Sequence, residues 1–394
     1  MFKKLQRLDY WIAVPFAVLS LLGIVMVFSA TQNAYLAPLY SFAKQAVFVA
    51  VGWSAAFFAF KVNRKVIRGE GFLTMLMIVT FGLLVVARLA PAINGAHGWI
   101  NLGPVTLQPV ELAKIALILY FSHYLAVRHW LPGKGVRGFL RSWNQSGYLP
   151  KLILPIMMLG ITLVMPDMGN LFITMAVLMM LLLASGVKVK DNIIWVVLFF
   201  LILAFLPEII SFFDLKESSS YAIRRLSNFV DPWYNMDQSR QLLYSYYAIS
   251  HGGLFGVGLG NSLLKPYLPE SNTDFIMAVA AEELGAVLVV VVLILMLILI
   301  GRLVLVGIRQ KSQYNRLFMY GLAGLLIMQS FVNLGGVLGL LPITGVVFPF
   351  ISGGGSSFVF FSAAVGYALN IAATAKKPAR PNPQDDAARR ELKH

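Results

Sequence analysis

Residues 268–275 read Leu-Pro-Glu-Ser-Asn-Thr-Asp-Phe, and a long, mostly apolar run follows them to Gly301. Asp274 therefore stands where a polar loop meets a segment long enough to cross a membrane. Two more carboxylates, Glu282 and Glu283, follow about two turns later. A carboxylate at such a boundary is costly unless it has a function. Asp274 is therefore the first candidate for a catalytic group.

The composition is that of a membrane protein. The chain is 58% hydrophobic and 12% charged, against roughly 45–50% and about 25% in soluble domains. A formal net charge of +15 would suggest nucleic acid for a soluble protein, but in a membrane protein it reflects Lys and Arg on the cytoplasmic side. We therefore expect no nucleic-acid partner. The absence of Cys excludes disulfides, thiol catalysis and Cys-ligated metals.

Ten segments are apolar enough to cross a membrane, which takes roughly 17–25 residues each. We therefore predict an all-α polytopic membrane protein, with a short fifth helix and with a first helix that is retained and not cleaved as a signal peptide. The approximate ranges are 11–30, 41–60, 70–90, 107–127, 151–166, 168–186, 191–212, 274–301, 317–341 and 354–375.

The distribution of basic residues predicts which side each loop faces. With the N-terminus inside, 24 of the 32 Lys and Arg residues fall on the cytoplasmic side, as the positive-inside rule requires. Both termini are then cytoplasmic, and residues 213–273 form a large outer loop between helices seven and eight. We expect residues 1–375 to be one transmembrane domain. The Pro-rich, charged segment 376–394 is typical of a disordered tail.

Helix four begins with polar residues that are unusual in a membrane. Gln108, Glu111 and Lys114 stand in its first turns, and Glu111 and Lys114 share one helix face. They form either a structural ion pair between helices or a functional pair that faces a polar cavity; the rarity of intramembrane charges favours the second. Asp167, before helix six, is better explained as a helix cap than as a catalytic group.

The outer loop 213–273 carries basic and glycine-rich segments. Arg224 and Arg225 are adjacent in an amphipathic stretch, and residues 241–250 suggest a helix on the membrane surface. Arg and Lys beside an outer carboxylate suit a phosphate-bearing substrate, while contact with lipid headgroups is the alternative for the two Arg. The glycines of 252–260 lack the Gly-Lys-Ser/Thr of a nucleotide-binding loop. The scattered His residues show no metal-site spacing.

The last outer loop, 341–357, is uncharged and rich in Pro, Gly and Ser. It is either a re-entrant hairpin packed within the protein or the wall of a cavity for a lipid-linked ligand.

Four motifs, in this order, resemble the SEDS family of peptidoglycan glycosyltransferases, to which FtsW and RodA belong. They are Asn94-Gly95 to Trp99 with 108–114 (Gln-Pro-Val-Glu-Leu-Ala-Lys); Arg225 to Asp231-Pro232-Trp233; 256–262 with 267–270 and 273–275; and Leu341-Pro342 to 349–352 with Gly354. The resemblance covers nearly the whole chain, and the combined spacing is specific. Two departures are Asn272, where the family usually has His, and Gly353.

The resemblance implies a reaction and roles for residues of these motifs. Lipid II would be polymerised on the outer leaflet, with release of undecaprenyl pyrophosphate. A sugar hydroxyl needs a positioned base, and Asp274 is the best candidate. Positive charge near the pyrophosphate would come from Arg224, Arg225 and Lys265. Glu111 and Lys114 would hold one face of the cavity and tune the base. Supporting or substrate-binding residues in the matching motifs are Gln108, Glu270 and Ser352.

The resemblance also implies partners and a place in the cell. The expected partner is a class B penicillin-binding protein, a transpeptidase docked on helices eight and nine, together with other membrane proteins of the division machinery. A divalent cation, Mg²⁺ or Mn²⁺, is possible at the pyrophosphate, although no ligand cluster indicates one. The segments 8–11 and 258–262 are more similar to the division branch than to the elongation branch. Alternatives are an elongation-type polymerase, a lipid II flippase and a non-catalytic scaffold.

Overall fold

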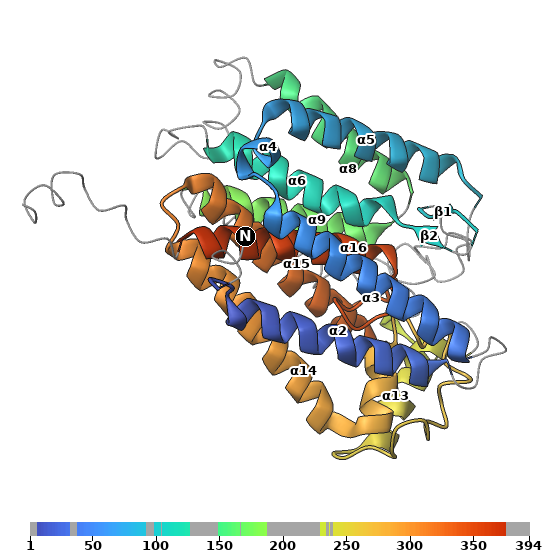
Figure 1. Cartoon of the computed structure of the whole chain (residues 1–394). Helices are drawn as coiled ribbons and strands as arrows, with labels where there is room; N and C mark the ends of the chain where they lie inside the picture. The colour runs from blue at the N-terminus through green and yellow to red at the C-terminus, as the bar shows by residue number, and fades with distance from the viewer. Residues whose placement is uncertain are drawn as a thin grey trace, which may run out of the picture.

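The structure, a computed structural model, describes residues 6–31, 38–91, 98–103, 105–126, 149–165, 167–186, 229–233, 236 and 239–375. These residues are mostly helical and include one two-stranded antiparallel hairpin (Figure 1). The elements are α2 (Tyr10–Ala30), α3 (Pro38–Lys61), α4 (Arg64–Ile67), α5 (Glu70–Leu89), β1 (Ile100–Asn101), β2 (Thr106–Leu107), α6 (Pro109–Ala126), η1 (Leu149–Leu152), α8 (Ile153–Val164), α9 (Met168–Ala184), α13 (Arg240–Gly252), α14 (Ile276–Ile308), α15 (Gln313–Val337) and α16 (Ser356–Ala375).

Each predicted span that falls within the described ranges is present as a helix. Six helices there are long and apolar enough to cross a membrane, namely α2, α3, α5, α14, α15 and α16, and two shorter apolar helices are α8 and α9. The predicted surface helix of 241–250 is present as α13. The seventh predicted helix, 191–212, lies outside the described residues. The chain is therefore a mostly helical, multi-pass membrane protein.

Among the six long apolar helices, α15 and α16 are the most buried. Helix α15 packs against α6, α9 and α14, while α16 lies along α3. The contact between α16 and α3 is close, because a Cβ atom added at Gly366 would lie 2.1 Å from the carbonyl oxygen of Ala56. The outer helices α3, α5 and α14 leave much apolar surface exposed, as lipid-facing helices do.

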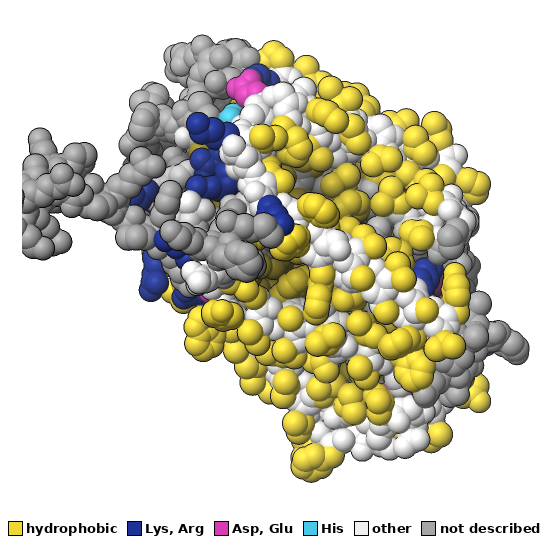
Figure 2. Space-filling view, in the orientation of Figure 1, with side chains coloured by type: hydrophobic (Ala, Val, Ile, Leu, Met, Phe, Trp, Pro, Cys, Tyr) yellow, Lys and Arg dark blue, Asp and Glu magenta, His cyan; other side chains and the backbone are white. Residues whose placement is uncertain are grey.

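The two ends of the bundle differ in chemistry. Figure 1 shows α4 and the N-terminus at one end, and the β1–β2 hairpin and α13 at the other. Lys and Arg side chains gather at the end with α4, and hydrophobic side chains cover the middle of the face shown in Figure 2. Near the N-terminus, Arg302 of α14 donates to both carboxylate oxygens of Asp9, with its Nε 2.9 Å from Oδ1 and its Nη2 2.8 Å from Oδ2. This ion pair joins α2 to α14.

Helix α14 is broken at Gly285, where the backbone has φ 76° and ψ 176°. The span predicted at 274–301 is present, but the sequence did not indicate the break within it. Residues 253–258 occupy the break: the amides of Val257 and Gly258 donate to the carbonyls of Glu282 and Glu283, at 3.0 and 2.8 Å. The amides of Ala286 and Val287 donate back to the carbonyls of Gly253 and Leu254. The loop thus satisfies the backbone groups that the break exposes, as a membrane helix requires.

Candidate functional site

Asp274 lies in the tight turn that leads into α14. It precedes the helix by two residues and is half-buried. The turn is anchored by the buried side chains of Leu268 and Phe275 on either side. Within it, the exposed Glu270 adopts a left-handed conformation with φ 56°, and its carboxylate accepts a hydrogen bond of 2.7 Å from the Thr273 hydroxyl. The sequence therefore presents a carboxylate at the start of a membrane helix, on a fixed turn.

The loop between α15 and α16 packs directly on this turn. The Ser352 hydroxyl donates to the Thr273 carbonyl at 2.7 Å and accepts from the amide of Phe348 at 2.8 Å. The amide of Gly353 donates to the Asn272 carbonyl at 2.9 Å. Ser352 is 3% exposed, so its bonds are made away from water. For the loop 341–357 the sequence allowed two interpretations, a packed hairpin or a cavity wall. In the structure this loop is hydrogen-bonded to the Asp274 turn.

A second group of polar residues lies inside the bundle around Lys114. Its ammonium donates to Glu111 Oε1 at 2.8 Å, to Asn170 Oδ1 at 2.9 Å and to Gln329 Oε1 at 2.7 Å. The predicted Glu111–Lys114 pair is thus present, and both side chains are 1% exposed. All three N–H donors of Lys114 are used. Glu111 Oε2, by contrast, is buried and has no hydrogen-bond partner among the described residues.

Asp167 joins this group from the start of α9. Its carboxylate accepts from the backbone amide of Asn170 at 3.2 Å and from the Asn170 side chain at 2.9 Å. The predicted role as a helix cap is confirmed. Burial raises the pKa of the Asp167 carboxyl, and the two hydrogen bonds from Asn170 oppose that shift.

Two amide side chains of α15 connect the Glu111–Lys114 pair to the Asp274 turn. Gln329 binds Lys114, and its Nε2 lies 3.3 Å from the Val347 carbonyl. Asn333, one turn further along α15, donates to the carbonyls of Asp274 at 2.7 Å and Val346 at 2.8 Å. Residues four apart lie about 6 Å apart along a helix, so the two halves of the site share one face of α15.

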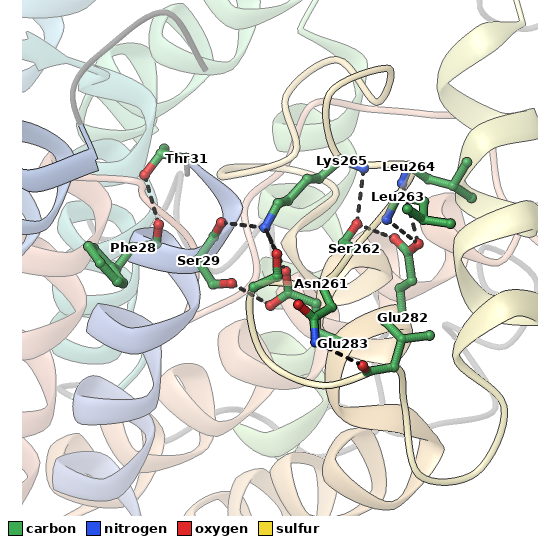
Figure 3. A network of polar contacts seen from close by, with 12 residues as sticks. Phe28, Ser29, Thr31, Asn261, Ser262, Leu263, Leu264, Lys265, Glu282 and Glu283 are labelled. Atoms are coloured by element: carbon green, nitrogen blue, oxygen red, sulfur yellow. Dashed lines mark hydrogen bonds and ion pairs between the residues drawn. The ribbon is translucent and has the colours of Figure 1, made fainter. Parts of the chain in front are cut away.

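Lys265 lies in a third polar group, beside the break in α14. Figure 3 shows it between the end of α2 and the two carboxylates of α14. Its ammonium donates to Glu283 Oε1 at 2.9 Å and to the carbonyls of Ser29 and Gly260 at 3.1 and 3.0 Å. The Ser29 hydroxyl donates to Glu283 Oε2 at 2.5 Å. Both oxygens of Glu283 and all three donors of Lys265 are therefore used within the protein.

The neighbouring Glu282 holds the segment before α14 in the same way. It accepts from the Ser262 hydroxyl, from the amides of Leu263 and Leu264 at 2.9 and 3.3 Å, and from His251 Nδ1 at 3.0 Å. Its side chain is fully buried, whereas that of His251 is 40% exposed. The two carboxylates that the sequence left without a role thus pin residues 251–265 to α14.

The remaining predicted site residues fall in different places. Gln108 is buried, and its backbone amide donates to the Ser356 hydroxyl at 3.2 Å. Arg224 and Arg225 lie outside the described residues. Within the part of the chain that the structure describes, no group of three or more His, Cys, Asp or Glu could hold a metal ion.

Sequence reasoning missed three buried amides, Asn170, Gln329 and Asn333. Each stands inside an apolar helix. Polar residues at such positions are rare and usually functional, so this signal could have found them.

Comparison with known proteins identifies the family of the chain. Residues 10–377 match the family described as "Cell cycle protein", FTSW_RODA_SPOVE. The protein named probable peptidoglycan glycosyltransferase FtsW of Lactococcus lactis is 35% identical, over 95% of this chain and 94% of its own length. The protein of that name from Coxiella burnetii is also 35% identical, over 92% and 96%. Stage V sporulation protein E of Bacillus subtilis is 30% identical, over 92% and 96%.

Solved structures share the fold over almost the whole chain. A chain from a structure titled "Structural coordination of polymerization and crosslinking by a peptidoglycan synthase complex" has a TM-score of 0.71 and 26% identity, covering 94% of this chain and 99% of that one. The rod shape determining protein RodA of Thermus thermophilus has a TM-score of 0.66 and 27% identity, with coverage of 94% and 98%. On these matches, the chain belongs to the FtsW/RodA/SpoVE family, the SEDS family.

Proposed function

We propose that this chain polymerises lipid II into the glycan strands of septal peptidoglycan. It is a peptidoglycan glycosyltransferase, as its relatives are named. The observation that supports lipid II polymerisation best is the position of Asp274. It is a half-buried carboxylate at the start of a membrane helix, and α15 and the loop before α16 hold its turn in place.

In the proposed reaction Asp274 is the general base. The 4-hydroxyl of an incoming lipid II attacks the anomeric carbon of the growing strand, and Asp274 takes the hydroxyl proton. A new carbon–oxygen bond forms as the bond between the anomeric carbon and the pyrophosphate oxygen breaks. Undecaprenyl pyrophosphate leaves with the electron pair. A sugar hydroxyl is a weak nucleophile, so a base within hydrogen-bond reach lowers the barrier.

The polar group around Lys114 is proposed to form the inner wall of the site. Glu111 has one carboxylate oxygen without a partner in the described protein, so it can accept a hydrogen bond from a substrate hydroxyl or amide. Lys114 fixes the direction of that carboxylate through three bonds to three helices.

Charge at the pyrophosphate is proposed to come from Arg224 and Arg225. The ammonium of Lys265 is already fully paired in this conformation, so we propose that it acts by fixing the loop beside the site. Mg²⁺ or Mn²⁺ at the pyrophosphate stays a prediction from the resemblance, and the reaction above has no step that depends on a metal.

We further propose the predicted topology: ten spans, cytoplasmic termini and an outer loop at 213–273, in the plasma membrane at the division septum. The expected partners are a class B penicillin-binding protein transpeptidase and other division proteins. The apolar side chains of Val287, Val290, Ile294 and Leu297 are exposed along α14, which offers a surface for a partner helix.

The test is polymerisation of lipid II by the purified protein with its cognate transpeptidase inactivated for cross-linking. Wild type and Asp274→Ala are compared by glycan length on a gel. Long glycan from wild type and none from a folded, partner-bound variant is the expected result. Equal product from both would remove Asp274 from the mechanism. No product from either, with lipid II crossing vesicle membranes, would favour a flippase.

A further inference from the structure

Three consecutive carbonyls at the start of α14 are each held by a different donor. The carbonyls of Asn272, Thr273 and Asp274 accept from the Gly353 amide, the Ser352 hydroxyl and the Asn333 side chain, at 2.9, 2.7 and 2.7 Å. A turn before a helix normally leaves such groups to water or to its own residues. Here three donors from outside the turn fix the backbone on which the Asp274 side chain stands.

Asn333 differs from the other two donors because it comes from a central helix. It is 4% exposed, and its Nδ2 also donates to the Val346 carbonyl at 2.8 Å. Both amide hydrogens are therefore used on two carbonyls. The opposite orientation of the amide would point its oxygen at both carbonyls, which would be repulsive. Chemistry thus fixes the orientation, and α15 holds the Asp274 backbone rigidly.

We infer that Asn333 is a positioning residue for the glycosyl transfer and that it acts through Asp274. This inference rests on the proposed function, in which Asp274 is the base. Asn333 does not need to touch the substrate. Its bond fixes the distance between the carboxylate and the Glu111–Lys114 pair, which Gln329 holds one turn away on the same helix. A misplacement of about 1 Å in such a group can cost about 10²-fold in rate.

Asn370 is a matched control for this role. It is also a buried asparagine of a central helix, and its Nδ2 also donates to two backbone carbonyls, those of Ala59 and Val62, at 3.1 and 2.8 Å. These carbonyls lie at the end of α3 near α4, the opposite end of the bundle. Asn333→Leu and Asn370→Leu therefore remove the same kind of bond, one beside Asp274 and one far from it.

The experiment measures kcat and KM for lipid II per folded protein, in the complex with the inactivated transpeptidase. Asn333→Leu should lower kcat about 10²-fold and leave KM nearly unchanged, because the groups that bind lipid II remain. Asn370→Leu should destabilise the fold to a similar extent but keep the wild-type kcat. Equal kcat values for the two variants would overturn the inference.

A second pair of variants keeps the test decisive if Asn333→Leu does not fold. Ser352→Ala removes the bond to the Thr273 carbonyl, whereas Ser352→Thr keeps a hydroxyl. We expect Ser352→Ala to lower kcat and Ser352→Thr to restore most of it; equal rates for both would count against the role of the three held carbonyls.

Asp274→Ala in the same assay separates failure of the proposed function from failure of the inference. If Asp274→Ala polymerises lipid II as fast as wild type, Asp274 is not the base and the inference fails with it. If Asp274→Ala loses activity while the Asn333 and Ser352 variants keep the wild-type kcat, only the inference is overturned.

Discussion

The protein contains two buried Lys–Glu pairs that look alike but differ in one respect. Glu111–Lys114 and Glu283–Lys265 have nitrogen–oxygen distances of 2.8 and 2.9 Å, and all four side chains are at most 1% exposed. Glu283 receives a hydrogen bond at each oxygen. Glu111 receives hydrogen bonds at Oε1, while its Oε2 is buried and receives none from the part of the chain that the structure describes.

The difference separates a structural pair from a candidate binding pair. Leaving a buried acceptor unsatisfied costs about 1–3 kcal/mol, and a ligand that donates a hydrogen bond to Glu111 Oε2 would remove that cost. The Glu283 pair joins α2, the loop and the broken helix, and it uses every donor and acceptor. The Glu111 pair keeps one acceptor for a group that the protein itself does not supply.

The largest expected effect comes from breaking the structural pair. Among the described residues, Lys265→Met leaves the buried Glu283 charge with only the Ser29 hydroxyl as a hydrogen-bond donor, and removing one member of a buried pair costs about 3–5 kcal/mol. Thermal unfolding in detergent should show a large drop in the midpoint. The double variant Lys265→Met/Glu283→Leu should recover much of that loss, because no buried charge remains. A single variant as stable as wild type would contradict this assignment.

The next effect concerns the break in α14. Gly285→Ala places a side chain at φ 76°, with a Cβ atom 2.2 Å from the Leu254 carbonyl oxygen. We expect a loss of about 1–3 kcal/mol from the strained backbone. Gly301→Ala is the control in the same helix, since its added Cβ meets no atom within 4 Å and Ala favours a helix. If Gly285→Ala were as stable as Gly301→Ala, the break would not be required.

The spans, the Asp167 cap and the Glu111–Lys114 pair could be predicted from the sequence because each depends on local spacing. A run of apolar residues specifies a membrane helix by its length, and residues three apart on a helix meet wherever the helix lies. The break at Gly285 could not be predicted this way. It depends on residues 253–258 entering the helix from outside, and the apolar pattern continues through it.

The same limit explains what was missed at the site. Asp274 could be singled out as a carboxylate at a helix boundary. Ser352 could be named only from the family resemblance, and Asn333 was missed. Their contacts with the turn could not be predicted, because Asn333 lies 59 residues beyond Asp274 and Ser352 lies 79 beyond Thr273, and both meet the turn only in the folded bundle. Lys265 shows the converse: a basic residue in an outer loop suggested a phosphate contact, but tertiary packing pairs its charge inside the protein.

A smaller effect on stability is expected at the candidate binding pair. Glu111→Gln removes the counter-charge of the buried Lys114, but Lys114 keeps three neutral acceptors, namely the new amide oxygen, Asn170 and Gln329, so we expect a loss of stability below the roughly 3–5 kcal/mol of a fully broken pair. Polymerisation per folded protein should nevertheless fall about tenfold or more, because 1.4 kcal/mol of lost interaction with the substrate is a factor of ten. Glu283→Gln is the matched control: it should cost a comparable amount of stability, because Lys265 keeps the carbonyls of Ser29 and Gly260, but should lower turnover less than Glu111→Gln does.

The smallest effect is expected at His251, on the edge of the structural group. Its ring nitrogen is one of four donors to Glu282, and its side chain is 40% exposed. His251→Gln removes that contact but leaves the Ser262 hydroxyl and two backbone amides, so we expect a loss below about 1 kcal/mol. The measurement compares the thermal unfolding midpoints of His251→Gln and Lys265→Met. A loss as large as that of Lys265→Met would mean that Glu282 depends on the imidazole more than on its backbone donors, and that the completeness of hydrogen bonding does not by itself distinguish the two kinds of pair.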